Sequence, residues 1–139
     1  VEEDECALTL SMPLEGNTNV HGSAFAGSLY SLCALSAWYT LFCCHFRKLG
    51  LDDSYVVVIK SAEIQYKRPV VDPLVLARCE LPDQVERDLF MKELSLHGKA
   101  TMTVRGVLLS RGKDGTENKK IRAEYSAVLC ALSKKTYKI

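Results

Sequence analysis

The sequence predicts an α+β fold in which a curved, mostly antiparallel sheet wraps one long apolar helix. Residues 16–46 contain no Asp, Glu, Lys or Arg, although 25% of the whole chain is charged. Five other segments have the alternation or the β-branched and aromatic content of strands. Four of these strands follow one another on short links, which favours antiparallel neighbours. One sheet can bury so apolar a helix only by curling around it.

The first strand and the helix stand at the N-terminal end. Residues 6–12 alternate, with Cys6, Leu8, Leu10 and Met12 on one face. The helix is predicted over residues 24–49, with Ser23 as its N-cap. One of its stripes consists of small residues: Ala24, Gly27, Ser28, Ser31 and Ala34. Its other faces carry bulky residues expected in the core: Leu29, Leu32, Leu35, Trp38, Leu41 and Phe42.

The remaining strands are predicted over residues 54–67, 74–81, 99–110 and 121–132. A short helix begins after Asp83, which can cap it, and ends near Gly98. Gly106 is expected to mark a bulge, and Asp114-Gly115 a hairpin turn. The polar tail after Ser133 is expected to be frayed.

Length and composition fit one domain spanning residues 1–139. The net charge of +1 predicts no general attraction to nucleic acid or to an anionic membrane. The six cysteines include no C-x-x-C pair, so no metal site is expected. Buried free thiols suit a reducing compartment, which predicts a cytoplasmic protein.

Residues 24–46 are long enough to cross a bilayer, which needs about 20 residues. The strands elsewhere nevertheless need a core to wrap. The segment also carries glycine, hydroxyl and imidazole groups at Gly27, Ser28, Ser31, Ser36, Thr40 and His45. We therefore predict a buried helix and no membrane association. The acidic opening of the chain also lacks the pattern of a signal peptide.

Two motifs support a family resemblance. The first reads Asn17-x-Asn19-x-x-Gly22-Ser23-x-Phe25-Ala-Gly27-Ser28, and the second Tyr66-Lys-Arg-Pro69-Val70. Together they resemble the hotdog-fold thioesterase domain found at the C-terminal end of some bacterial acetyltransferase-like proteins. The resemblance implies a curved antiparallel sheet around a central helix, and hydrolysis of an acyl thioester. It also implies a homodimer or a dimer of dimers, with the site between subunits.

The chain departs from the wider hotdog thioesterases at two points. Their pattern Asn-x-x-Gly-x-x-His-Gly-Gly falls on residues 19–27, where Phe25 and Ala26 replace the His and the middle Gly. Many of those enzymes also carry an Asp or Glu about two turns into the helix. The matching stretch here is Cys33-Ala34-Leu35, without a carboxylate. The resemblance therefore carries over the binding scaffold but not the usual catalytic acid.

The candidate catalytic residues are Asn19, His21 and Gly27. The first amides of a helix have no internal partners and can polarise a thioester carbonyl, which Gly27 would let approach closely. Asn19 can orient that carbonyl or a water, or else brace a turn. His21 is the imidazole nearest this entry, as a general base or as an ordinary surface residue.

Candidate substrate-binding residues surround the same entry: Gly22, Ser23, Phe25, Ser28, Ser31, Lys67 and Arg68. Ser28 and Ser31 can hydrogen-bond the thioester, but no base is evident that would make either a nucleophile. Lys67 and Arg68 can meet the phosphates of coenzyme A, although a solvated strand end is an equal alternative. Glu63 is the acid that a neighbouring subunit's sheet could best bring to the site, and Asp72 is the other candidate.

The sequence thus predicts a hydrolase of acyl groups carried on coenzyme A or acyl carrier protein, with no cofactor besides that carrier. The missing helix carboxylate keeps a rival open, a non-catalytic module that binds or senses such thioesters. A dehydratase on the same fold would need a His and an acid, and only His21 is at hand. Bulky residues such as Trp38 and Tyr39 are expected at the floor of the pocket.

Overall fold

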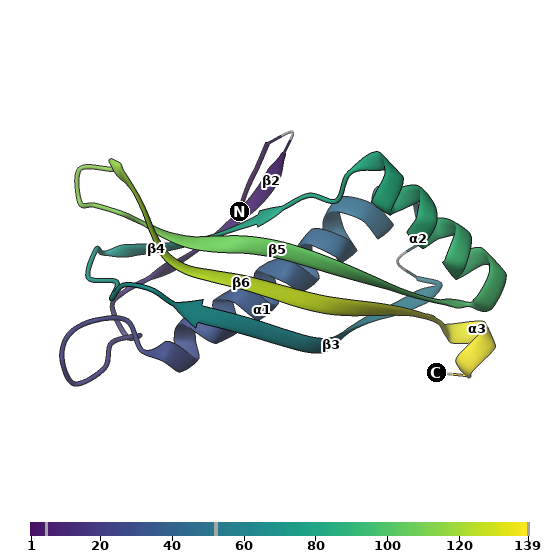
Figure 1. Ribbon diagram of the computed structural model, residues 1–139, viewed down its shortest axis with the longest axis horizontal. Coiled ribbons are helices and arrows are strands. Elements are labelled where there is room, and N and C mark those ends of the chain that lie inside the picture. The colour runs from purple at the N-terminus through teal and green to yellow at the C-terminus, as the bar shows by residue number, and fades with distance from the viewer. Residues whose placement is uncertain (5, 52, 139) are drawn as a thin grey trace.

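The protein folds into one six-stranded antiparallel sheet that curves around a central helix (Figure 1). The computed structural model describes residues 1–4, 6–51 and 53–138, apart from the side chain of Cys44. The strands lie in the order β1-β2-β4-β5-β6-β3. Their bounds are β1 Glu2–Glu3, β2 Ala7–Pro13, β3 Tyr55–Tyr66, β4 Leu74–Glu80, β5 Lys99–Arg111 and β6 Glu117–Ser133. The helices are α1 Ala26–Leu41, α2 Gln84–His97 and α3 Lys134–Tyr137, with a π-helical turn η1 at Phe42–Phe46.

The helix α1 lies on the concave face of the sheet, and this confirms the predicted architecture. Alternate residues of β5 and β6 point toward it and are buried: Ala100, Met102, Val104, Ala123, Tyr125, Ala127, Leu129 and Ala131. The facing side of α1 contributes Leu29, Leu32, Cys33, Ala37 and Leu41. Because strand side chains alternate between faces, the predicted inward sets identify the concave face correctly.

A buried contact between Tyr125 and Gly106 joins the helix to the middle of the sheet. A Cβ on Gly106 would lie 2.4 Å from the Tyr125 ring and 2.5 Å from the carbonyl oxygen of Arg78. The Tyr125 hydroxyl also lies 3.0 Å from the Ser36 hydroxyl of α1. The predicted bulge at Gly106 is wrong, since the register shift between β5 and β6 falls between Leu108 and Ser110. The glycine instead makes room for the tyrosine ring.

The helix starts two residues later than predicted. Its N-cap is Phe25, without a side-chain capping bond. The Ser23 hydroxyl, predicted to cap the helix, accepts a hydrogen bond of 2.8 Å from the Asn19 side chain. The entry loop therefore uses Ser23 for its own turn, and the first turn of α1 is uncapped.

The helix also ends earlier than predicted, because a π-helical turn follows Leu41. Trp38 stacks on Phe42 with ring centroids 4.7 Å apart, and its indole N–H donates to the carbonyl of Val57 at 2.8 Å. Phe46, in the π-turn, is fully buried. No described helix is both long and apolar enough to span a bilayer.

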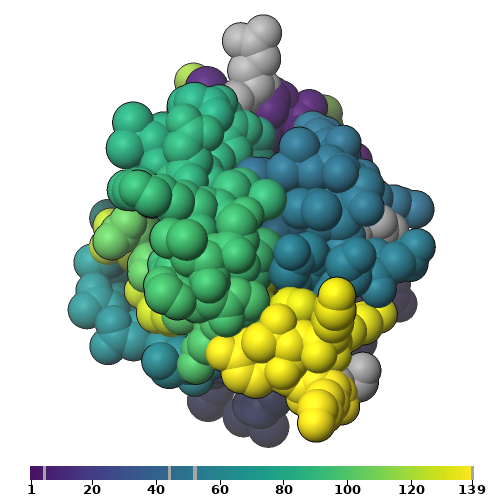
Figure 2. Space-filling model, turned by 90° about the vertical axis from the view of Figure 1, so that its right-hand side faces the viewer, coloured from purple at the N-terminus to yellow at the C-terminus, as the bar shows by residue number. Residues whose placement is uncertain are grey.

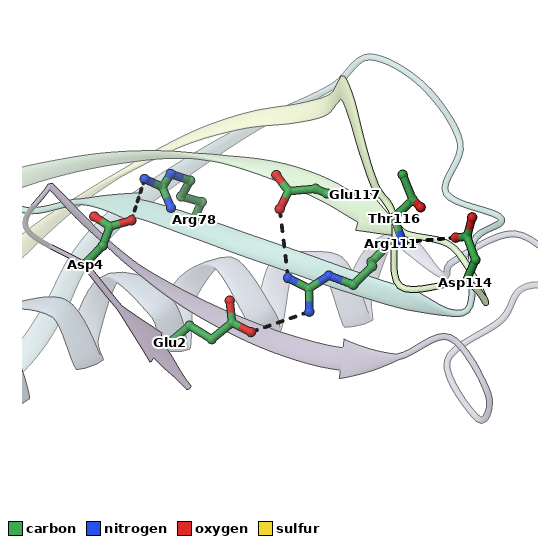
Figure 3. A network of polar contacts seen from close by, with 7 residues as sticks. All are labelled: Glu2, Asp4, Arg78, Arg111, Asp114, Thr116 and Glu117. Atoms are coloured by element: carbon green, nitrogen blue, oxygen red, sulfur yellow. Dashed lines mark hydrogen bonds and ion pairs between the residues drawn. The ribbon is translucent and has the colours of Figure 1, made fainter.

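The acidic N-terminal segment forms β1, which the sequence did not predict because two acidic residues carry no strand signal. Arginines hold this segment to the sheet (Figure 3). Glu2 lies 3.5 Å from Arg111, and Asp4 lies 2.8 Å from Arg78. The tail is likewise more ordered than predicted, since Ser133 caps α3 by accepting from the amide of Thr136 at 3.3 Å.

Three parts of the chain lie side by side at one end of the molecule: α2, the segment that follows α1, and the C-terminal α3 (Figure 2). Asp83 caps α2 as predicted, accepting from the amide of Glu86 at 2.8 Å. His45 is buried there between Phe46 and Phe90. No described group hydrogen-bonds its Nε2. Burial, and then the charge of Arg87, lower the pKa of His45.

A buried, neutral His45 makes the fold sensitive to acid. Because its pKa is lower in the folded chain than in the unfolded chain, the stability it contributes is complete above its unfolded pKa of about 6.5. That stability is lost as the pH falls through the folded pKa. We expect His45→Phe to flatten the dependence of the unfolding free energy on pH between about 7.5 and 5. Urea unfolding at several pH values measures this.

The matched control is His21→Ala, which removes an exposed imidazole from the opposite end of α1. It should leave the pH dependence as it is in the unsubstituted protein. An unchanged pH slope in His45→Phe would contradict the assignment.

Candidate functional site

The loop between β2 and α1 is organised around the Asn19 side chain. Its Oδ1 accepts from the amides of His21 at 2.9 Å and Ser23 at 3.2 Å, and its Nδ2 donates to the Ser23 hydroxyl. The Asn19 main chain adds bonds to Ser23 and Gly22. The structure thus gives Asn19 a bracing role in the entry loop, which was one of its two predicted roles.

Two further residues set the path into α1. Asn17 donates from Nδ2 to the Pro13 carbonyl at 2.9 Å, and its own carbonyl accepts from the amide of Phe25 at 2.7 Å. Gly22 has φ +81°, a left-handed conformation that favours glycine. The loop is therefore fixed by local bonds, and it delivers the helix start in a defined position.

The first turn of α1 presents free hydrogen-bond donors. Among the described groups, none accepts from the amides of Ala26, Gly27 or Ser28. These amides stand at the positive end of the helix dipole, and no side chain caps them. The arrangement can bind a carbonyl oxygen and stabilise a developing negative charge.

Two grooves border this turn on opposite sides. The first, here called the apolar groove, has a volume of about 690 Å³ and lies between α1 and β2. Its lining is Ser11, Met12, Pro13, Asn17, Phe25, Gly27, Ser28, Ser31, Leu32 and Leu35. The second, here called the basic groove, has about 330 Å³. It is lined by Asn19, Ala24, Ala26, Leu29, Tyr66, Lys67, Arg68, Pro69 and Val70.

Phe25 covers Gly27 at the head of the apolar groove. A Cβ on Gly27 would lie 2.5 Å from Cε1 of the Phe25 ring. Gly27 therefore leaves room for a close approach, and in this structure the approaching group is the Phe25 ring rather than a carbonyl or an acyl chain. Phe25 is 54% exposed, so its ring borders both the groove and solvent.

Of the other residues predicted at the entry, some line a groove and others do not. His21 is exposed and lines neither groove. Ser28 and Ser31 both line the apolar groove, and the Ser31 hydroxyl donates to the Gly27 carbonyl at 2.9 Å. Ser23 is held inside the entry loop by Asn19. The structure thus brings the two helix serines to a common groove and leaves His21 outside it.

Lys67 and Arg68 lie together at the basic groove, just past the end of β3. Lys67 has a loose ion pair with Glu124 at 3.7 Å, and Arg68 donates to the Ile121 carbonyl at 2.8 Å. The neighbouring Tyr66 hydroxyl donates to the Ala26 carbonyl at 2.9 Å, which fixes the end of β3 to the helix start. Both cations are exposed and available to an anion.

The two candidate acids do not reach the first turn of α1. Glu63 is exposed, in phase with Gln65 on the convex side of β3, where both line a hollow with Arg105. Asp72 accepts from the Ser110 hydroxyl at 2.5 Å and lies 3.8 Å from Arg122. No carboxylate is among the described residues that line either groove. Within one chain, the described residues therefore supply no acid to either groove.

Cys33 of α1 is also excluded as a nucleophile. Cys33 lies on the buried side of α1, and burial raises the pKa of its thiol to about 12, with a smaller contribution from Cys79. A thiol with such a pKa stays protonated near neutral pH, and the thiolate is the reactive form.

The comparisons with known proteins agree with this architecture. A family model described as "Putative thioesterase (yiiD_Cterm)" matches residues 1–121. The chain belongs to this thioesterase family. The match includes both motifs of the resemblance and the whole entry loop.

Solved structures show the same hotdog-type fold. A protein of unknown function from Chlorobaculum tepidum, OLEI01261, is 24% identical with a TM-score of 0.79, over 94% of this chain and 79% of that one. A "putative thioesterase" from Shewanella oneidensis is 23% identical with a TM-score of 0.75, over 95% and 81%. Thioesterase HI1161 from Haemophilus influenzae is 14% identical with a TM-score of 0.66, over 96% and 76%.

Sequence reasoning missed several groove residues of this thioesterase-family chain. Met12 and Pro13 line the apolar groove, but nothing in the sequence tells which strand borders the open side of the helix. Leu35, predicted in the core, is 53% exposed and lines this groove. Tyr66 could have been noted as a candidate, since it opens the second motif. Its hydrogen bond to the helix start, however, depends on the three-dimensional fold.

The contact between Phe25 and Gly27 predicts a non-additive pair of substitutions. Gly27→Ala in the unsubstituted protein should change the free energy of unfolding by less than about 0.5 kcal/mol, because displacing the exposed Phe25 ring offsets the helix preference of alanine. In a Phe25→Ala background the same change should raise it by about 0.5 kcal/mol, since alanine favours helix over glycine. Chemical denaturation of the four proteins measures the coupling. Additive effects would show that the ring does not occupy this space.

Proposed function

We propose that this protein hydrolyses acyl thioesters carried on coenzyme A or acyl carrier protein. The observation that carries the proposal is the position of three free amides between an apolar and a basic groove. The thioester carbonyl accepts from the first-turn amides of α1, chiefly that of Gly27. The acyl chain enters the apolar groove, and the carrier crosses the basic groove.

The chemistry of each groove supports this orientation. Met12, Leu32 and Leu35 offer apolar surface to an alkyl chain, which gains about 0.8 kcal/mol for each buried methylene. Lys67 and Arg68 offer two positive charges to a phosphate, which arginine in particular binds through paired donors. A carbonyl between them experiences the helix dipole, and one oxyanion donor is worth about 10²–10³ in rate.

Water is the nucleophile in this proposal, and His21 is the candidate base. The His21 amide is held by Asn19, so that Asn19 positions the turn on which the imidazole stands. The imidazole itself is exposed and lines neither groove, so in this proposal it acts through a water at the solvent side of the entry. Asn19 therefore acts as a positioning residue rather than by touching the carbonyl.

We also propose a homodimer. β3 is an edge strand of 12 residues, and its Val58 and Ile59 are 40% and 38% exposed. An unpaired edge of this length invites another strand. Tyr30 of α1, whose hydroxyl donates to the Ala62 carbonyl of β3 at 3.4 Å, adds to the exposed apolar surface beside this edge. A second copy that pairs at β3 would cover this surface and bring its own side chains to the site.

One observation favours the rival function, binding without hydrolysis. The described residues that line the two grooves include no carboxylate, and the imidazole of His21 lies outside both. A module with this surface would hold an acyl thioester without activating water.

Thiol release separates the two functions. The purified protein is incubated with acyl-CoA substrates of several chain lengths, and free coenzyme A is followed after correction for the protein's own exposed Cys6. The hydrolase proposal predicts protein-dependent release. Tight binding with no release at any chain length would establish the binding module instead.

Two variants then test the assignment of residues. His21→Ala should lower kcat by about 10²-fold if the imidazole is the base. Asn19→Ala should lower kcat about tenfold, because the loop that carries His21 loses three hydrogen bonds. The exposed His97 in α2 supplies the control, and His97→Ala should leave kcat unchanged. Normal kcat in both entry-loop variants would remove them from the mechanism.

The dimer has its own test. Sedimentation should show a dimer for the unsubstituted protein and a monomer for Ile59→Asp, because a charge would be buried at the β3 edge. Val85→Asp places the same charge on an exposed position of α2 and should leave the dimer intact. A monomer at assay concentration without any substitution would contradict the proposal.

A further inference from the structure

The apolar groove runs along α1 as far as Leu35, the last helix residue that lines it. Gly27 and Leu35 are eight residues apart on α1, which corresponds to about 12 Å along a helix at 1.5 Å per residue. An extended chain advances about 1.2 Å per bond. The groove therefore matches an acyl chain of about ten carbons lying beside α1.

The side chains along the groove explain why it begins and ends there. Gly27, Ser28 and Ser31 are small and leave space between the helix and β2. One turn after Ser31 comes Leu35, the last helix residue that lines the groove. Farther along, the helix carries bulky Tyr39 and Phe42, and neither lines the groove.

The structure also settles the role of Trp38, which the sequence placed at the floor. Its indole N–H donates to the Val57 carbonyl at 2.8 Å, and its ring stacks on Phe42. Trp38 is thus turned toward β3, away from β2 and the apolar groove. The position that limits the groove is Leu35, whose side chain is 53% exposed.

We infer that the protein selects medium-length acyl groups and that Leu35 sets the length. This inference rests on the proposed function, since it assigns an acyl chain to the groove. Each methylene up to about the tenth gains contact with Met12, Leu32 or Leu35. Later carbons pass Leu35 and reach solvent, because nothing described encloses the groove beyond it. Leu35 is therefore a specificity-determining residue, and it takes no part in the chemistry.

A ladder of saturated acyl-CoA substrates from four to sixteen carbons tests the inference. For the unsubstituted protein, kcat/KM should rise up to about fourfold per methylene as far as about ten carbons, and then level off. Leu35→Ala should move the plateau about two carbons shorter, because the last methylenes lose their contact, and Leu35→Trp should move it about two carbons longer. Leu89→Ala, at an exposed leucine of α2, is the matched control and should leave the ladder unchanged.

A second series of ligands tests the chain-length preference by binding alone, independently of hydrolysis. Non-hydrolysable S-alkyl-CoA thioethers of the same lengths are titrated by calorimetry, and their affinities should follow the same pattern. Absence of thiol release with a normal binding ladder would end the hydrolase proposal and leave the groove assignment intact. A plateau that the Leu35 substitutions do not move would overturn the inference. The inference would also be overturned if Leu35→Trp changed the sedimentation coefficient but left the chain-length preference unchanged, because the groove would then be a contact between copies of the chain.

Discussion

Burial of the uncharged helix α1 is the constraint on which the rest of the structure depends. The segment from residue 16 to residue 46 carries no charge, so the helix within it cannot leave most of its surface in water, and the sheet buries it by curving. The fit is closest where the Tyr125 ring fills the space over Gly106 and meets Ser36. One side of the helix stays open, as the exposure of Tyr30, Ser31 and Leu35 shows. The open side and the uncapped first turn are where the two grooves meet.

The sequence predicted the parts of this fold that follow from periodicity and from turn chemistry. Alternation identified the inward faces of β5 and β6, and Asp83 identified the start of α2. The sequence could not show that the Ser23 hydroxyl would accept from Asn19 instead of capping the helix, since a serine at this position can do either. The π-helical turn after Leu41 depends on tertiary packing around Phe46, and β1 depends on ion pairs with distant arginines.

The candidate site was predicted in outline for similar reasons. The family motifs fall on residues that do surround the helix start, and Gly27, Ser28 and Ser31 do share one groove. Two residues differ from their predicted catalytic and binding roles. Asn19 makes its hydrogen bonds within the loop, and the Phe25 ring fills the space above Gly27. Leu35 shows the limit of periodicity. A leucine on an apolar helix looks like core from the sequence, and only the open side of the sheet makes it a groove residue.

The missing carboxylate gives this family member its particular interest. With neither groove lined by an acid in the described structure, catalysis would rest on the helix amides, the imidazole of His21 and whatever a second copy contributes. The central claim is that a thioester carbonyl binds the first-turn amides of α1. The most direct test is amide NMR with an acyl-CoA analogue in which a methylene replaces the thioester sulfur. The amide signals of Ala26, Gly27 and Ser28 should shift strongly on binding. Shifts confined to the convex hollow around Glu63 and Arg105 would contradict the account.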